Sequence, residues 1–245
     1  MKIINAKWEK RNLGVDCNEV KIEPEDTVEI LKKRSAEYET EYTVIKVPIG
    51  MIEISHCLQS LGYSFMELLT YCHNRGVLPS FSPIQKRIIK SVSCEEMQDK
   101  DIRRLHKELN NDMFVDDRVS LDPKFSQDQA NRRYIGWISD DVKLGGKLFK
   151  MLYKGKAVGF FTFKKEGNDS YVLNLGGFYP SFEKFGFGIC LNYHIINEGI
   201  KKSAKRISTG FSSNNRGASA IHFSLGLTLD QQYYVFVKHI DKSIL

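Results

Sequence analysis

Pro180-Ser-Phe-Glu-Lys-Phe-Gly-Phe-Gly188 is the stretch that decides the fold, because it lies where strand composition gives way to helical spacing. The residues before it, 171–179, read Tyr-Val-Leu-Asn-Leu-Gly-Gly-Phe-Tyr and predict a strand. The residues after it place Ile189, Tyr193 and Ile196 on one helical face. The glycines therefore lie in a strand-to-helix turn, which exposes backbone N–H groups that suit a phosphate. Gly-x-Gly also occurs in ordinary tight turns, so the turn alone leaves both interpretations open.

The composition is that of a globular chain. Its 245 residues are 42% hydrophobic with a mean hydropathy of −0.34, which is enough for one large domain or two small ones. No segment reads as a signal sequence or a membrane span, so we expect a cytoplasmic protein with no membrane partner. The five cysteines are dispersed and never at Cys-x-x-Cys spacing, which favours reduced thiols over disulfides or a metal site.

The positive charge of the chain is compatible with an anionic ligand, either a nucleic acid or a small polyanion. The net charge is +6 and the pI is near 8.9, but basic residues are mixed with acidic ones except at Lys201-Lys202 and Lys205-Arg206. A nucleic-acid surface would gather its basic residues on one face. The charge is therefore compatible with a small polyanion such as a nucleotide or coenzyme A, and we expect no nucleic-acid partner.

Two α/β units follow one another along the chain. In the first, strands and helices alternate, and they are expected at residues 19–22, 24–36, 42–47, 51–61 and 63–70. Gly76, Pro79 and Pro83 then break every periodicity. We place the domain boundary there, with a small α/β domain over residues 1–78 and a larger domain over residues 79–245.

The second unit is expected to open with a strand over residues 84–92 and a charged helix over 94–109. After a less regular passage, strands are expected at residues 148–153, 157–164, 171–178 and 206–210, with a hairpin turn at 154–156. Asn214 or Asn215 then caps a short helix that ends at Leu225-Gly226.

Three motifs at these spacings resemble the acetyl-CoA-binding core of the GNAT N-acyltransferase superfamily: Pro180-x-x-x-x-x-Gly186-x-Gly188, Asn215-x-x-Ala218 and Leu225-Gly226-Leu227. The resemblance covers about residues 84–245. It implies a mixed, mostly antiparallel sheet with two splayed strands and flanking helices, preceded here by the smaller N-terminal domain. It also implies an enzyme that uses acetyl-CoA or another acyl-CoA as co-substrate.

The resemblance further implies which residues bind that co-substrate. The pantetheine arm would lie along the backbone of Gly177, Phe178 and Tyr179, and Asn215 would contact the co-substrate. The pyrophosphate would lie on the turn made by Lys184, Phe185, Gly186, Phe187 and Gly188. The family usually has Gln or Arg where this chain has Glu183, which removes a side-chain donor but leaves the backbone N–H groups in place.

The chain also resembles the TDP-fucosamine acetyltransferase group at Trp8-Glu-Lys-Arg-Asn-Leu-Gly14, Leu61-Gly-Tyr-Ser-Phe65 and Arg133-Tyr-Ile-Gly-Trp137. That group acylates the amine of a dTDP-linked amino-deoxysugar, so the resemblance implies the same acceptor here, with an acetyl or a longer hydroxyacyl donor. In that group a tyrosine protonates the departing CoA thiolate, and His222 occupies the matching place. Histidine titrates near neutral pH and can supply this proton, although a histidine on an apolar helix face is often a core residue.

The acceptor site is expected in residues 120–137. Arg132 and Arg133 would pair with a diphosphate, and Tyr134 or Trp137 would stack on a base or sugar. The alternative for each is a solvated arginine or a core aromatic residue.

Two other functions stay open at this point. A tandem-GNAT aminoacyl transferase, which uses charged tRNA, is favoured by the positive charge and by the recurrence of Ser-Leu-Gly at residues 60–62 and 224–226. The intact glycine turn disfavours it, because a tRNA donor needs no pyrophosphate site. A non-catalytic CoA-binding protein would account for Glu183 and the missing tyrosine. A homodimer is compatible with the sequence.

Overall fold

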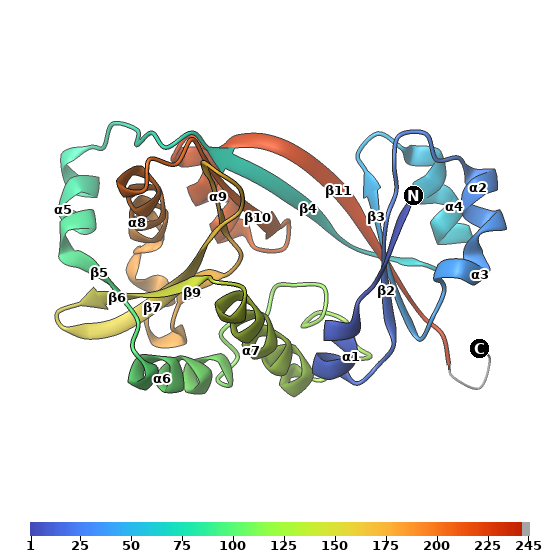
Figure 1. Ribbon diagram of the computed structural model, residues 1–245, viewed down its shortest axis with the longest axis horizontal. Helices are drawn as coiled ribbons and strands as arrows, with labels where there is room; N and C mark the ends of the chain where they lie inside the picture. Colours follow the sequence, from blue (N-terminus) through green and yellow to red (C-terminus); the bar gives the residue numbers. More distant parts are fainter. Residues whose placement is uncertain (242–245) are drawn as a thin grey trace.

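A computed structural model describes residues 1–241, and it shows one long sheet with helices on both faces (Figure 1). The strand order is β1-β2-β3-β11-β4-β10-β8-β7-β6-β5, and β9 lies beside β7. The pairs β2–β3 and β10–β8 are parallel and the other neighbours are antiparallel. The expected α/β class, with a mixed and mostly antiparallel sheet, is confirmed.

The strands are β1 (Lys2–Asn5), β2 (Cys17–Lys21), β3 (Tyr42–Pro48), β4 (Ser64–Asn74), β5 (Val92–Glu96), β6 (Lys147–Tyr153), β7 (Lys156–Lys165), β8 (Ser170–Leu173), β9 (Gly176–Phe178), β10 (Arg206–Ser212) and β11 (Thr228–His239). The helices are α1 (Lys7–Leu13), α2 (Val28–Lys33), α3 (Ser35–Tyr38), α4 (Ile52–Ser60), α5 (Pro83–Ser91), α6 (Asp99–Leu109), α7 (Gln127–Lys143), α8 (Gly188–Lys201) and α9 (Arg216–Ser224), with a 3₁₀ helix, η1, at Pro180–Phe185. None of these helices is long and apolar enough to cross a membrane.

Two long strands, β4 and β11, run from one half of the molecule into the other (Figure 1). β11 follows the whole second unit in sequence, yet it pairs with β3 and β4, where Phe236 lies opposite Ile45 on one side and Phe65 on the other. The strand β11, which comes last among the described residues, is therefore part of the N-terminal half of the sheet. The division at residues 78 and 79 stays a prediction, and the sheet passes through it without a break in pairing.

The core has separate clusters on the two faces of the sheet. In the N-terminal half, Ile45 and Phe236 pack with α2, α3 and α4, whereas Val44 and Val235 face α1 and α7. In the C-terminal half, residues of β7 and β10 pack against α8 and α9, and the other face of β7 packs against α6 and α7 through Phe160. Each half therefore has helices on both of its faces.

The strand predicted over residues 84–92 is wrong, because these residues form α5. Ser82 caps the helix by accepting a hydrogen bond from Gln85 N, and the Gln85 side chain accepts in turn from Ser82 N. Pro83 occupies the first helical turn, where its missing N–H costs nothing. This capping box was readable in the sequence, and it outweighs the apolar content that suggested a strand.

Other elements also differ from the expected ones. The helix predicted over residues 94–109 begins only at Asp99, because residues 92–96 pair with β6 as β5. The helix predicted over 24–36 is two shorter helices, α2 and α3, that meet at Arg34. The less regular passage contains the long helix α7, which Ser126 and Gln129 cap in the same way as α5.

Candidate active site

The two strands that the resemblance expects to splay do separate. β8 and β10 run parallel as far as the pair Leu173–Thr209. Beyond this pair β10 continues beside β4, whereas β9 pairs with β7. Thr162 holds the junction between β8 and β9, since its hydroxyl accepts hydrogen bonds from the N–H groups of Asn174 (3.2 Å) and Leu175 (3.1 Å). The space between the diverging strands is called the splay below.

The backbone of β9 presents to this splay polar groups that pair with no strand among residues 1–241. Tyr179 N donates to Val158 O at 2.8 Å, so in the antiparallel ladder Gly177 also points its N–H and C=O toward β7. The N–H and C=O groups of Gly176 and Phe178 consequently point the other way, into the splay. Of the three residues predicted to lie along the pantetheine arm, Phe178 therefore offers its backbone groups, while Tyr179 has its N–H engaged and its side chain buried.

The glycine turn has the expected geometry. Gly186 has φ of 73° and ψ of 19°, a left-handed conformation that favours glycine, and it follows η1 directly. Helix α8 begins at Gly188, and in its first turn Cys190 N donates a hydrogen bond to Phe187 O at 2.7 Å. A Cβ at Gly188 would lie 3.1 Å from Cγ1 of Ile221, so this glycine also permits the contact between α8 and α9. Lys184 and the half-exposed Phe185 flank the turn.

Asn215 caps α9, as one of the two predicted alternatives. Its Oδ1 accepts a hydrogen bond from Ala218 N at 2.9 Å. The carbonyl oxygen of this side chain is therefore engaged within the protein, which leaves its amide group for the predicted contact with the co-substrate.

His222 is buried between α9 and β10. The residue is only 6% exposed, and the centroid of its ring lies 5.2 Å from that of Phe211. Nδ1 is 2.7 Å from the carbonyl oxygen of Ala218, so the neutral ring donates from Nδ1 and keeps a free lone pair on Nε2. Burial lowers the pKa of His222 below 6.5, which outweighs the opposite effect of the Ala218 carbonyl. The resting residue is neutral at pH 7 and accepts a proton at Nε2 more readily than it donates one.

We expect this burial to make stability depend on pH. The pKa of His194 is also lowered by burial, and its Nε2 lies 2.9 Å from Val92 O. In the unfolded chain both histidines titrate near pH 6.5, whereas in the folded protein they titrate at a lower pH. As the pH falls through this interval, the unfolded chain binds more protons than the folded protein. The two histidines therefore cost no stability above about pH 6.5, and the free energy of unfolding decreases as the pH drops below it. The double variant His194→Gln/His222→Asn should lose less stability than the wild type between about pH 7.5 and pH 5 in urea unfolding. An identical loss in both proteins would contradict this expectation.

A cavity of about 1000 Å³ lies on the face of the sheet that carries α1 and α7, and it borders the splay at residues 173–175 and 208–210. Both halves of the molecule line it: Trp8, Glu19, Lys21 and Lys46 from the N-terminal half, and Trp137, Asp141, Lys164 and Arg206 from the other. Tyr71 of β4 and Tyr233 of β11 complete its wall. A ligand in this cavity would lie next to a thioester held in the splay.

The predicted acceptor residues are divided between this cavity and the interior. Trp137 lines the cavity. Arg132 is exposed, with its Nε 3.5 Å from Asn12 O, and it is not among the lining residues. Tyr134 is buried against Phe114, with the ring centroids 4.6 Å apart.

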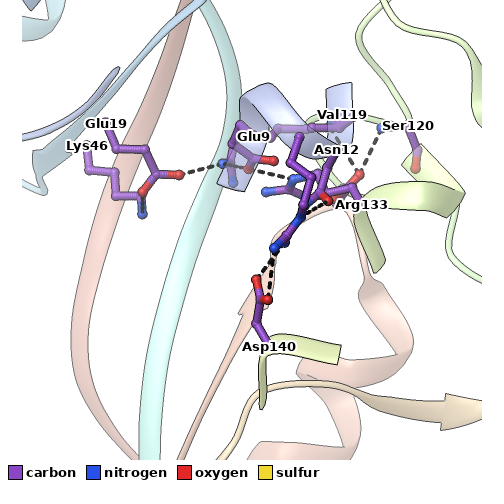
Figure 2. A network of polar contacts seen from close by, with 11 residues as sticks. Glu9, Asn12, Glu19, Lys46, Val119, Ser120, Arg133 and Asp140 are labelled. Atoms are coloured by element: carbon purple, nitrogen blue, oxygen red, sulfur yellow. Dashed lines mark hydrogen bonds and ion pairs between the residues drawn. The ribbon is translucent and has the colours of Figure 1, made fainter. Parts of the chain in front are cut away.

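Arg133 is fully buried in a network of ion pairs (Figure 2). Its Nε donates to Glu9 Oε1 and its Nη1 to Asp117 Oδ2, both at 2.7 Å, and its guanidinium lies 3.8 Å from the centroid of the Trp137 ring. Two carboxylates therefore already neutralise Arg133, and a diphosphate cannot reach it without displacing them. The arginine joins α7 to α1, across the two halves.

The network continues to the cavity wall through Arg118 and Glu19. Arg118 Nη2 donates to Glu19 Oε1 at 2.7 Å, and Lys46 Nζ to Glu19 Oε2 at 2.8 Å. Burial raises the pKa of Glu19, but Arg118 and Lys46 outweigh it and lower the value to about 2. Arg118 was not predicted from sequence, because nothing local distinguishes it from other basic residues; only its contact with β2 brings it to the cavity.

Known proteins are similar to this chain in fold and, at low identity, in sequence. No family model matches the chain. The spore coat polysaccharide biosynthesis protein SpsD of Bacillus subtilis (strain 168) is 22% identical over 243 residues, which cover 95% of this chain and 81% of that protein.

Two solved structures extend the comparison. A GCN5-related N-acetyltransferase from Sphaerobacter thermophilus superposes with a TM-score of 0.61 at 11% identity, covering 99% of this chain and 78% of that one. A tandem GNAT protein from the clavulanic acid biosynthesis pathway gives a TM-score of 0.51 at 9% identity, covering 92% of this chain and 76% of that one. At these identities the likeness concerns the fold, and the chain has the fold of the GCN5-related N-acetyltransferases.

Proposed function

We propose that this protein is an acyl-CoA-dependent N-acyltransferase that acts on the amino group of a dTDP-linked amino sugar. The observation that carries the proposal is the position of the splay. It borders a large cavity on one face of the sheet, and the strand that forms it leads directly into the glycine turn. A donor and an acceptor bound at these two places would meet at the unpaired backbone of β9.

Acyl-CoA fits the first of these places. Its pantetheine arm is an amide chain that can pair with the backbone of Gly176 and Phe178, and its pyrophosphate suits the N–H groups at the start of α8 with Lys184 beside them. The N–H of Phe178 would also donate to the oxyanion that forms when the thioester carbonyl is attacked. The chain supplies these groups from its backbone, so Glu183 does not exclude the co-substrate.

An amino sugar suits the second place. Acidic and basic side chains line the cavity in equal number, and tryptophan and tyrosine rings lie among them. A wall of this kind suits the sugar of such an acceptor, because its apolar ring faces can pack on the aromatic rings and its hydroxyl groups can hydrogen-bond to the polar side chains. The name of the B. subtilis relative, a spore coat polysaccharide biosynthesis protein, supports a sugar acceptor.

His222 would then move the proton that the reaction transfers. Attack of a neutral amine on the thioester forms the C–N bond, and collapse of the tetrahedral intermediate breaks the C–S bond. Nε2 of neutral His222 can accept the proton that leaves the nitrogen and pass it to the CoA sulfur. The products are an amide and CoA thiol, and no proton is gained or lost overall.

A tandem-GNAT aminoacyl transferase is a second candidate. The recurring Ser-Leu-Gly and the continuous sheet through both halves favour it, as does the likeness to the tandem GNAT structure over 92% of this chain. The two candidates differ in their donor. Incubation with a panel of dTDP-amino sugars and acyl-CoAs should release free CoA thiol with at least one pair, whereas charged tRNA should transfer nothing to any of these acceptors. Absence of thiol release with every pair would refute the proposed function.

The valine variant of Gly186 tests the co-substrate site. We expect Gly186→Val to weaken CoA binding at least tenfold, about 1.4 kcal/mol, because a branched side chain at positive φ forces the turn away from the geometry that presents its N–H groups. Gly155→Val is a matched control: Gly155 has φ of +74° against +73° at Gly186, and a Cβ at either position meets nothing within 4 Å. Calorimetry should show wild-type CoA affinity for Gly155→Val. If Gly186→Val has the same CoA affinity as Gly155→Val, the glycine turn does not bind the co-substrate.

A further inference from the structure

Asp141, near the C-terminal end of α7, has one carboxylate oxygen without a partner. Its Oδ1 accepts from Lys164 Nζ at 2.9 Å and from Asn174 Nδ2 at 2.7 Å. Its Oδ2 is buried and makes no hydrogen bond within residues 1–241. The side chain is only 7% exposed, and it lines the large cavity. An unpaired buried carboxylate oxygen is costly, so this position is complete only when a donor occupies it.

This oxygen is held at the edge of the splay. Asn174, which donates to Asp141, joins β8 to β9 at the point where β9 leaves β10. Lys164, the other donor, is near the end of β7 and lies opposite Val172 of β8. Asp141 is thus tied to the two strand segments that border the expected position of the thioester.

The cavity has two more unpartnered polar groups, and both can donate. The hydroxyl of Tyr233 and Nε of Arg118 are buried without a hydrogen-bond partner in the described part of the chain. Tyr233 lies on β11 opposite Pro48, and Arg118 pairs with Glu19, so these two groups are associated with the N-terminal half. The cavity therefore combines an acceptor beside the splay with donors that belong to the other half.

We propose that Asp141 binds the amino group of the acceptor through Oδ2 and orients its nitrogen toward the splay, while Tyr233 and Arg118 donate to oxygen atoms of the attached sugar or nucleotide. The inference rests on the proposed function and names how the acceptor is held. Lys164 already balances the charge of Asp141, so the position accepts the N–H of a neutral amine, the form that attacks a thioester. An acceptor analogue with hydrogen in place of the amine has no donor there and leaves Oδ2 unpaired.

The test compares a dTDP-amino sugar with the dTDP-deoxysugar that has hydrogen in place of the amine, and therefore no donor, at the same carbon. In calorimetry the wild type should bind the amino sugar about tenfold or more tightly than this deoxy analogue, the usual effect of a hydrogen bond to a charged group. Asp141→Asn, which keeps an oxygen for Lys164 and Asn174 but replaces Oδ2 by an NH₂ donor, should reduce this preference to less than about threefold. In the thiol-release assay it should lower kcat/KM for the acceptor by at least about tenfold and leave the KM for acetyl-CoA unchanged.

Asp140→Asn is the matched control, because it removes the same charge one residue away. Both oxygens of Asp140 are bound by Arg11, at 3.0 and 2.6 Å, so its variant should keep the preference for the amine. Tyr233→Phe removes only a hydroxyl that has no partner in residues 1–241, and it should weaken binding of the amino sugar and of its deoxy analogue alike.

The outcomes separate this inference from the proposed function. If the wild type releases thiol and Asp141→Asn keeps the wild-type preference for the amine, the inference is overturned and the function stands. If the wild type releases no thiol but its preference for the amino sugar is lost in Asp141→Asn, the function fails and the binding site is supported. If the wild type binds no amino sugar of the panel, the inference is overturned as well.

Discussion

Arg133→Met is expected to lower the free energy of unfolding by about 3–5 kcal/mol, because removing one partner of a buried ion network leaves the others uncompensated. Arg133 and Glu9 both have side chains with no exposure, and Asp117 lies on the other side of the guanidinium. In the variant, Glu9 keeps only the longer contact to Arg118 at 3.6 Å. Urea unfolding of the wild type and of Arg133→Met measures this difference in free energy directly.

Arg11→Met provides the comparison for a surface pair. Arg11 and Asp140 are 50% and 32% exposed, so water screens their attraction and the loss should stay below about 1 kcal/mol. The double variant Arg133→Met/Glu9→Gln should recover part of the stability, since it also removes one stranded charge. If Arg133→Met and Arg11→Met destabilise the protein equally, Arg133 is not the structural centre of this network.

His222→Asn is expected to lower kcat about a hundredfold, the usual range for the loss of a positioned proton-transfer group. Asparagine can donate to Ala218 O from a position close to that of Nδ1, so the variant keeps the local hydrogen bond and removes Nε2. CoA affinity should therefore be unchanged. The measurements are kcat by thiol release, CoA affinity by calorimetry and the melting temperature, all on the same protein.

His194→Gln is the control for burial. His194 is also buried enough to have a lowered pKa, and its Nε2 lies near a backbone carbonyl, which the glutamine amide can reach. It should cost a similar amount of stability and leave kcat near the wild-type value. A near-normal kcat in folded His222→Asn would show that His222 is a core residue and that another group or water moves the proton.

The sequence predicted the donor side of the candidate site better than the acceptor side. The turn at Gly186, the cap at Asn215 and the end of the helix before Leu225 depend on residues within a few positions of one another, so their signals are local. The capping box at Ser82 was equally local, but the strand prediction for residues 84–92 relied on their apolar content and overlooked it. The separation of β9 from β10 followed from the resemblance, and its register required the structure.

The acceptor side could not be derived from local patterns, because its residues come from elements far apart in the chain. Arg133 was predicted to bind a diphosphate on the basis of its residue type. Its partner Glu9 is 124 positions away, and that contact turns it into a buried structural residue. Asp141 and Tyr233 carried no signal, since an acidic residue at a helix end and a tyrosine in a strand are both ordinary.

The sequence by itself determined the alternation of strands and helices over residues 17–74, the strand-to-helix glycine turn and two neighbouring candidates for the cap of α9, because each depends on backbone preferences and hydrogen bonds over a few residues. Only the tertiary structure decided which charges meet. Pairing of β11 with β3 and β4 closes the two halves around the cavity, and this selects Arg133 and Glu9 for burial while it leaves Oδ2 of Asp141 without a partner. Burial and ion pairing depend on distance in space, and the order of residues along the chain does not specify that distance.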